Sequence, residues 1–211
     1  MIKKIAGVLL ILSLTLLAYY RFWFLRLPER KIPHDEKAIV SPANGKVVAV
    51  FPWNDSLLLI TKKDMGALRT WTGDLDTAGY VVHIQMNVTN VHYQRAPTDA
   101  VVVSERYVPG NFANAVMMNN EWGIRFENEH NEITLQTPAG RRYKVIQIAG
   151  FVARRIDDYV QKGQPVKQGD VIGLIKLGSQ VTLVLPHDVK VLVKPGDTVI
   201  EGESIVAEWH Y

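Results

Sequence analysis

The chain has 211 residues, which suits one sizeable domain, and its apolar content is ordinary for a globular protein. Cysteine is absent, which excludes a disulfide framework, a thiol nucleophile and a thiolate metal site. The net charge of +3 is uneven, because residues 1–37 hold seven Lys or Arg against three Asp or Glu, and the rest of the chain, 38–211, sums to −1. A nucleic-acid-binding protein carries its positive charge on the folded domain, so we expect no nucleic-acid partner.

An apolar segment spans Ile5–Leu25, and its 21 residues suffice to cross about 30 Å of hydrocarbon. Aromatic side chains gather at its C-terminal end, as at a membrane interface: Tyr19, Tyr20, Phe22, Trp23 and Phe24. A cleaved signal peptide is the alternative, but these bulky residues occupy the place of a small-residue cleavage site. We therefore expect residues 1–26 to be a retained anchor in the cell membrane. More positive charge follows the segment than precedes it, which favours a domain facing the cytoplasm.

Residues 27–37 are rich in proline and charge and predict a linker out of the membrane. Short runs rich in Val, Ile and aromatic residues follow and predict strands at Val47–Phe51, Leu57–Thr61, Tyr80–Met86, Ala100–Val108, Ile124–Glu127, Glu132–Gln136 and Arg142–Ile148. Phe112–Met118 is a possible helical turn, and Ala153–Tyr159 is too short to assign. The expected fold is mainly β with a few short helices, in a β-sandwich domain covering residues 38–211.

An internal repeat lies near the C-terminus. Its spacing of Gly, Val, Gly and Ile recurs at one constant offset, first as Gly163, Val166, Gly169 and Ile172 and then as Gly196, Val199, Gly202 and Ile205. The uniform register is similar to the two halves of a biotinyl or lipoyl type of β-sandwich. The alternative is two unrelated hairpins that both need glycine for a positive φ.

Between the two halves of the repeat, a Gly178-Ser179 pair begins an apolar, strand-like run that ends at Pro186. Most Gly-Ser pairs are turns, so this pair indicates a function only together with other motifs in the chain. Four other segments appear in order before it: Ser41-Pro-Ala-Asn-Gly-Lys-Val47, Asn90-Val-His-Tyr-Gln-Arg-Ala-Pro97, Gly110-Asn-Phe-Ala-Asn-Ala115 and Gln147-Ile-Ala-Gly-Phe-Val-Ala-Arg-Arg-Ile156. Over roughly residues 25–207, the chain resembles the short, single-domain phosphatidylserine decarboxylase proenzymes, which include archaetidylserine decarboxylases.

The resemblance implies a pyruvoyl-dependent enzyme that acts on the serine headgroup of a membrane phospholipid, either diacyl or archaeal ether. Decarboxylation of an amino acid needs an electron sink, which no ordinary side chain supplies, and a pyruvoyl carbonyl is one such sink. By resemblance, self-cleavage between Gly178 and Ser179 leaves a β chain ending at 178. The α chain then begins with a pyruvoyl cofactor made from Ser179, and the two chains stay associated.

By the same resemblance, His92 is the base that activates the serine hydroxyl. The family has an Asp, which orients the histidine, where this chain has Asn44. An amide accepts a hydrogen bond but brings no charge, so the resemblance leaves the rate of maturation open; Asp99 is another acid that could supply the charge. Arg95 is a candidate to bind the lipid phosphate, as is the pair Arg154-Arg155, for which a surface ion pair is as good an interpretation.

The remaining histidines are scattered without ligand spacing, so we expect no metal site. His83 stands in an alternating apolar strand and is expected to be structural. Two alternatives to the enzyme stay open at this point: a non-cleaving, lipid-binding relative, and an adaptor of the biotinyl or lipoyl type. A homodimer is a further possibility that the sequence does not decide.

Overall fold

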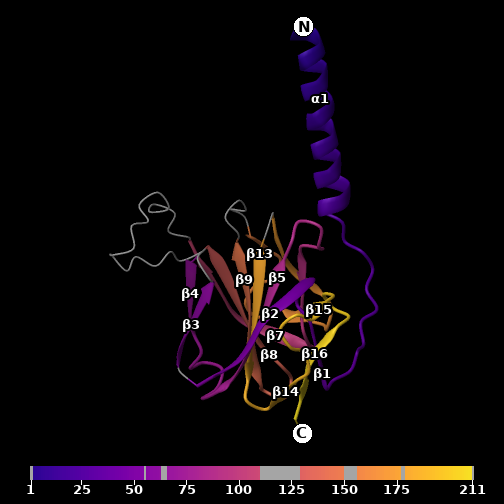
Figure 1. Ribbon diagram of the computed structural model, residues 1–211. Helices are drawn as coiled ribbons and strands as arrows, with labels where there is room; N and C mark the ends of the chain where they lie inside the picture. The colour runs from indigo at the N-terminus through magenta and orange to yellow at the C-terminus, as the bar shows by residue number, and fades with distance from the viewer. Residues whose placement is uncertain are drawn as a thin grey trace, which may run out of the picture.

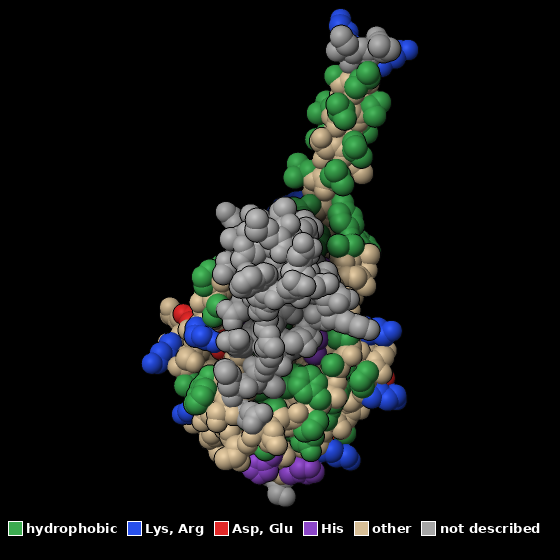
Figure 2. All heavy atoms as spheres, turned by 60° about the vertical axis from the view of Figure 1, so that its left-hand side comes forward, with side chains coloured by type: hydrophobic (Ala, Val, Ile, Leu, Met, Phe, Trp, Pro, Cys, Tyr) green, Lys and Arg blue, Asp and Glu red, His purple; other side chains and the backbone are tan. Residues whose placement is uncertain are grey.

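The computed structural model describes residues 2–54, 56–62, 66–109, 129–149, 156–176 and 179–210. One long helix projects from a β domain (Figure 1). It begins as α1 (Ile2–Ala18) and continues as the π-helical turn η1 (Tyr19–Phe24). Apolar side chains line α1 in the view of Figure 2, and exposed apolar residues recur along the helix from Ile5 to Leu17. Its two lysines stand at its N-terminal end. The span Lys3–Phe24 is long and apolar enough to cross a membrane, which is consistent with the expected anchor.

The β domain is built on one curled, antiparallel sheet of eight strands. In spatial order they are β11 (Pro165–Val166), β7 (Ala100–Val108), β8 (His130–Gln136), β9 (Arg142–Ala149), β13 (Ser179–Pro186), β5 (Gly79–Met86), β2 (Gly45–Trp53) and β15 (Thr198–Val199). The mainly β class is thereby confirmed, and the predicted strands on described residues match β2, β3, β5, β7, β8 and β9 to within two residues at either end. The expected strand Ile124–Glu127 and helical turn Phe112–Met118 lie outside the described residues.

Three smaller sheets complete the domain. Their strands are β1 (Ala38–Val40), β16 (Ile205–Trp209) and β14 (Val189–Val191) in the first, β10 (Ile156–Asp158), β12 (Val171–Ile175) and β6 (Tyr93–Arg95) in the second, and the hairpin β3 (Leu57–Lys62) and β4 (Gly66–Trp71) in the third. The first two sheets supply side chains to the same core as the main sheet. The core therefore lies between layers, as in a sandwich.

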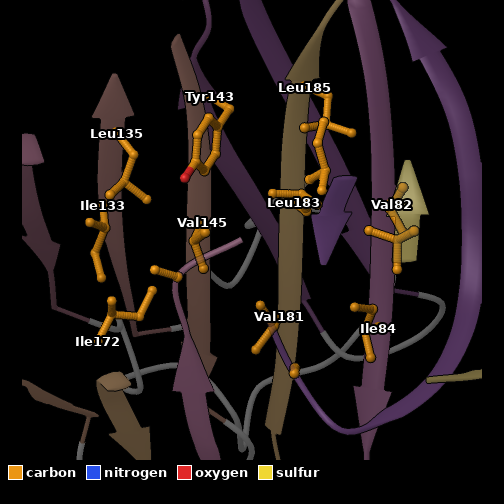
Figure 3. Packing of buried hydrophobic residues seen from close by; sticks show 14 of the residues in the cluster. Val82, Ile84, Ile133, Leu135, Tyr143, Val145, Ile172, Val181, Leu183 and Leu185 are labelled. Atoms are coloured by element: carbon orange, nitrogen blue, oxygen red, sulfur yellow. The ribbon is translucent and has the colours of Figure 1, made fainter. Parts of the chain in front are cut away.

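Alternation along the central strands fills this core. Every second residue of β8, β9, β13 and β5 points to one face, where Figure 3 shows Ile133, Leu135, Tyr143, Val145, Val181, Leu183, Val82 and Ile84 side by side. All eight are fully buried. The period of two sends alternate residues to this face, and a second buried cluster that includes Val81, Ile146, Ile148 and Val184 lies on the opposite face of β5, β9 and β13. Strand β13 is thereby held in register between β5 and β9.

The two ends of the main sheet have the same construction. Strands β1 and β2 correspond to β6 and β7 at one constant offset along the chain, and β15 pairs with β2 in the register in which β11 pairs with β7. The contacts between the halves are reciprocal: Val40 N donates to Pro97 O and Arg95 N donates to Pro42 O, both at 3.0 Å. Reciprocal contacts of this kind are the mark of a two-fold relation. The domain is thus pseudo-two-fold symmetric, which the sequence analysis did not predict.

The C-terminal repeat has one local structure twice. All four of its glycines have a positive φ, between 76° and 104°. Gly163 N and Gly196 N donate to Val102 O and Val47 O at 2.8 Å, and these two acceptors are equivalent positions of β7 and β2. Each copy of the repeat therefore belongs to a different half of the pseudo-symmetric domain, and its glycines are needed for the turns. Its likeness to biotinyl or lipoyl domains is not confirmed and stays a prediction.

Segment 27–37 is a docked strap rather than the contact-free linker that its composition suggests. Arg30 pairs with the fully buried Glu201 at 2.6 Å, and Lys31 N donates to Glu203 at 3.0 Å. The side chain of Ile32 lies against the equivalent turns at Gly169 and Gly202, where a Cβ on either glycine would overlap it. The strap therefore crosses between the two halves of the domain.

We expect Arg30→Ala to destabilise the full-length protein by about 3–5 kcal/mol, because it leaves the Glu201 carboxylate buried without its cation. Thermal unfolding in detergent measures the effect. Lys31→Ala is the matched control, because its exposed side chain removes a charge from the same strap without uncovering a buried partner. Equal stability of the two variants would contradict the role given to the Arg30 ion pair.

Candidate functional site

His92 lies one residue before β6, on the loop that leaves β5. Its carbonyl accepts a hydrogen bond of 3.1 Å from Ile175 N, the last residue of β12. Strand β13 begins four residues later at Ser179, which pairs with Met86 of β5 and with Ala149 of β9. Four residues span at most about 14 Å. Ile175, held at His92, therefore lies no more than about 14 Å from the start of the central strand, where the predicted cleavage position stands.

Hydrogen bonding fixes the tautomer of His92. Its Nδ1 lies 2.9 Å from the carbonyl oxygen of Asn90, and a carbonyl only accepts, so Nδ1 carries the proton. The lone pair of the neutral ring is then on Nε2. This atom is buried and has no hydrogen-bond partner among the described residues. A buried, unpartnered acceptor of this kind is poised to take a proton from a group brought next to it.

Burial also sets the charge of His92, whose side chain is fully covered. Removal from water lowers the pKa of the imidazole to about 4, against a smaller opposing effect of the hydrogen bond to Asn90. The positive charge of Arg26 lowers this pKa further. His92 is thus neutral throughout the physiological pH range, which is the state a general base requires.

No hydrogen bond joins Asn44 to the His92 ring among the described residues. Asn44 Oδ1 accepts a hydrogen bond of 3.0 Å from Asn90 Nδ2, and it is Asn90 that holds His92 through its main-chain carbonyl. The side chain of Asn90 is held in turn, because its Oδ1 accepts from Asn87 N at 2.8 Å. Asn44 thus supports the loop that orients the histidine, and its amide oxygen can accept this hydrogen bond without a carboxylate.

Asp99 lies in the other half of the domain. It directly precedes β7 as Asn44 directly precedes β2, so the two residues stand at equivalent points of the pseudo-symmetry. Its carboxylate accepts hydrogen bonds of 2.8 Å from Lys167 Nζ and from Gln168 N. Despite partial desolvation, these bonds hold the pKa of Asp99 below its ordinary value. The geometry gives no support to Asp99 as the charged partner of His92.

Arg95 uses its guanidinium on backbone carbonyls. Its Nη1 donates to Gly169 O at 2.7 Å and its Nη2 donates to Pro28 O at 3.1 Å, while its buried Nε has no partner among the described residues. Burial lowers the pKa of Arg95, and the nearby Glu201 opposes this. These contacts tie the strap to the domain, so an anionic ligand would have to compete with them.

A buried chain of amides behind His92 was missed by sequence reasoning. Gln94 Nε2 donates to His92 O at 2.7 Å, Gln147 Nε2 donates to Gln94 Oε1 at 2.8 Å, and Asn131 Nδ2 donates to Gln147 Oε1 at 3.2 Å. A Cβ at Gly173 would overlap Gln147, which explains the glycine. Gln94 and Gln147 stand in two of the motifs, and that is the signal that points to them. The amides join β6, β8 and β9 in one rigid unit.

Several predicted residues lie outside the described part of the chain: Gly178, the pair Arg154-Arg155 and the segment Gly110–Ala115. Of Ser179 the strand position is described, at the start of β13. His83 is buried within β5 and its Nδ1 lies 2.7 Å from Thr182 Oγ1, as suits a structural role. The described residues contain no cluster of three or more metal-ligating side chains.

Comparison with known proteins shows the family of the chain. The family model "Phosphatidylserine decarboxylase" matches residues 17–207. A phosphatidylserine decarboxylase proenzyme of Burkholderia pseudomallei (strain 1106a) is 36% identical over 208 residues, which cover 99% of this chain and 87% of that protein. The proenzyme of Burkholderia ambifaria (strain MC40-6) is 36% identical over 193 residues, 92% of this chain and 80% of the relative.

These matches place the chain among the carboxy-lyases, whose reactions release carbon dioxide. It belongs to the phosphatidylserine decarboxylase family, and the resemblance noted from its motifs is confirmed. The interpretation as a biotinyl or lipoyl adaptor is thereby displaced by membership of an enzyme family.

Proposed function

We propose that the chain is a proenzyme that cleaves itself between Gly178 and Ser179 and then decarboxylates phosphatidylserine, or its archaeal ether counterpart, to the ethanolamine lipid. The observation that carries this is His92, a buried neutral base with a free Nε2, whose carbonyl is held by Ile175, four residues before the start of β13. Membership of the family supplies the reaction class.

Self-cleavage balances without any outside oxidant. The Ser179 hydroxyl adds to the Gly178 carbonyl and the C–N bond breaks, which converts the peptide to an ester. Loss of a proton from Cα of residue 179 then expels the Gly178 carboxylate, and water hydrolyses the remaining enamine to a ketone and ammonia. The β chain ends at Gly178 and the α chain begins with the new carbonyl.

His92 fits the proton transfers of this sequence. A serine hydroxyl is a weak nucleophile until a base removes its proton. The base atom would be Nε2, because Nδ1–H is already committed to Asn90 O. Burial of the ring keeps it neutral and ready to accept.

The pyruvoyl group, once formed, supplies the electron sink for the carbanion that remains when carbon dioxide leaves. The residues of this chain hold the group in place. The α chain contributes β13, which pairs on one side with β5 and on the other with β9, both of the β chain. Strands β15 and β16 also pair with β-chain strands. These ladders would keep the two chains together after cleavage.

The lipid substrate fits the place of the site in the molecule. The loop that carries His92 contacts the end of the membrane span, since Tyr19 Oη donates to Val88 O at 3.1 Å and Arg26 donates to Thr89 O at 2.6 Å. A headgroup would therefore reach the site at the membrane surface. The positive charges that follow the span favour a cytoplasmic domain. Arg95 remains a candidate contact for the lipid phosphate if Gly169 or Pro28 releases it.

Intact mass of the purified full-length protein tests the proposal. We expect two chains, one of residues 1–178 and one of residues 179–211, and the smaller should resist Edman sequencing because it has no amino terminus. Release of carbon dioxide from serine-labelled phosphatidylserine vesicles should accompany the mature form. A single mass equal to the whole translated chain after long incubation would refute self-cleavage.

Asn44→Asp should change the rate of self-cleavage less than about tenfold. The substituted carboxylate would still accept from Asn90 Nδ2, and a charged acceptor strengthens such a bond by only about 1 kcal/mol. The loss of about 10⁴ known for an Asp-to-Asn change in a protease triad does not apply, because Asn90 O already fixes the His92 tautomer. Time courses of proenzyme disappearance measure the effect.

Asp99→Asn is the matched control for this variant, since residue 99 is equivalent by pseudo-symmetry and lies outside the site. We expect its maturation rate to equal that of the wild type. An acceleration of 10³ or more in Asn44→Asp would show that residue 44 contacts His92 directly during the reaction. A slow Asp99→Asn variant would mean that the charge comes from Asp99.

A further inference from the structure

The end of the membrane span is packed onto the candidate base. Phe24, the last residue of η1, is fully buried, whereas the rest of the span is largely exposed, including Phe22 at 79%. The Phe24 ring lies against the His92 ring, with 4.2 Å between centroids and 36° between planes. Tyr20 stacks on the Phe24 ring at 5.5 Å. A stack of three rings thus runs from the membrane span into the site.

Further contacts hold the span and the His92 loop together. Arg26 donates through Nη1 to Trp23 O at 2.7 Å and through Nη2 to Thr89 O at 2.6 Å, so one guanidinium links η1 to the loop. Tyr19 Oη reaches Val88 O on the same loop. In Figure 1 the foot of the helix meets the domain beside the turn that follows β5.

The π-helical form of η1 has a physical consequence for Phe24. A π-helical turn is wider than an α-turn and shifts the residues that follow it around the helix axis, and such turns are frequent at functional sites. Trp23 and Phe22 stay exposed at the level of the aromatic belt, while Phe24 turns inward. A residue of the anchor therefore covers the histidine where a soluble domain would leave it open to water.

We propose that Phe24 is a positioning residue for His92, which it holds in its rotamer and shields from water, so that docking of the membrane anchor completes the base. This inference rests on the proposed role of His92. The charged groups around the ring are few: Arg26 is the one that acts on it in the described part of the chain, and it stays in place when Phe24 is changed. Phe24 has no group that can exchange a proton, so it acts only through His92.

Carbethoxylation of His92 by diethyl pyrocarbonate tests the proposal without relying on activity. The reagent attacks the neutral ring, and tandem mass spectrometry reads the product at residue 92. In the wild type, with a pKa of about 4, the rate should be slow and nearly constant between pH 5.5 and 7.5. In Phe24→Ala, the pKa should move toward its ordinary value near 6.5, so the rate should fall about tenfold from pH 7.5 to 5.5.

Full-length variants in phospholipid vesicles allow matched comparisons. Phe22→Ala removes an exposed ring from the same turn and should keep the flat profile. Phe24→Leu retains an apolar cover and should keep it as well. If the alanine variant does not insert or fold, Phe24→Val replaces it. The pKa of His92 that its rate profile gives is then expected to rise as well. Self-cleavage of the alanine variant should show the same tenfold fall in rate toward pH 5.5.

Two results would overturn the proposal. One is a flat profile in Phe24→Ala, and the other is a Phe24→Leu profile as dependent on pH as that of the alanine variant. Failure of the proposed function looks different, because wild-type protein that never cleaves still reports its His92 reactivity. In that case, a shift in the pH dependence of carbethoxylation in Phe24→Ala would support the contact between anchor and histidine. The proposed role of His92 as a base would be refuted.

Discussion

Ser179→Ala should abolish self-cleavage and decarboxylation together. In the proposed mechanism, the Ser179 hydroxyl is the nucleophile of the first reaction and the carbon skeleton of this residue becomes the cofactor of the second, so no residual route to either remains. The fold should survive, because strand β13 keeps its backbone pairs with β5 and β9 whatever side chain stands at its first residue. Intact mass should stay at that of the whole chain, and carbon dioxide release from phosphatidylserine vesicles should fall to background.

Ser104→Ala provides the control for this variant, since Ser104 also lies on a strand of the main sheet, β7, away from the proposed cleavage position. It should mature and turn over like the wild type. Lipid decarboxylation retained by Ser179→Ala would show that the electron sink lies elsewhere, and the proposed function would then fail even if the fold and family assignment stand.

His92→Asn should slow self-cleavage by a factor of about 10²–10⁴, the usual contribution of a general base. Asparagine is the sharpest substitution, because its amide N–H takes the place of Nδ1–H toward Asn90 O while nothing replaces Nε2. The proenzyme should therefore accumulate in folded form. The half-time of proenzyme disappearance on a denaturing gel measures the loss, and circular dichroism confirms that the domain is folded.

His83→Asn serves as the buried counterpart for this test. His83 lies within β5, where its ring contacts Thr182 of the neighbouring strand β13. Its replacement should affect stability more than the rate of maturation. If His92→Asn matured as fast as the wild type, the base would have to be another group, and the free Nε2 would have no part in the proton transfers.

The order of strands along the chain was largely predictable, and the arrangement of the halves was not. Runs of Val, Ile and aromatic residues predict β2, β5, β7, β8 and β9, because the preference of β-branched and aromatic side chains for strands is a local property. Strands of two or three residues, such as β11 and β15, are too short to carry this signal, and they form because the long strands offer an edge. The pseudo-symmetry was not visible in the sequence because few residues are identical between the halves. What the halves share is the register of their strand pairs and the positions of their glycine turns.

The candidate site divides in the same way. The resemblance of its sequence motifs to the family singles out His92, Ser179 and Asn44. The apolar run near the N-terminus predicts a membrane span, since hydrocarbon thickness sets the length that such a span needs. Only the tertiary structure decides that Asn90, through its carbonyl, orients the histidine, that Asp99 belongs to the other half, and that Phe24 covers the ring. Such contacts join residues distant in sequence, and they exist only when packing brings their elements together.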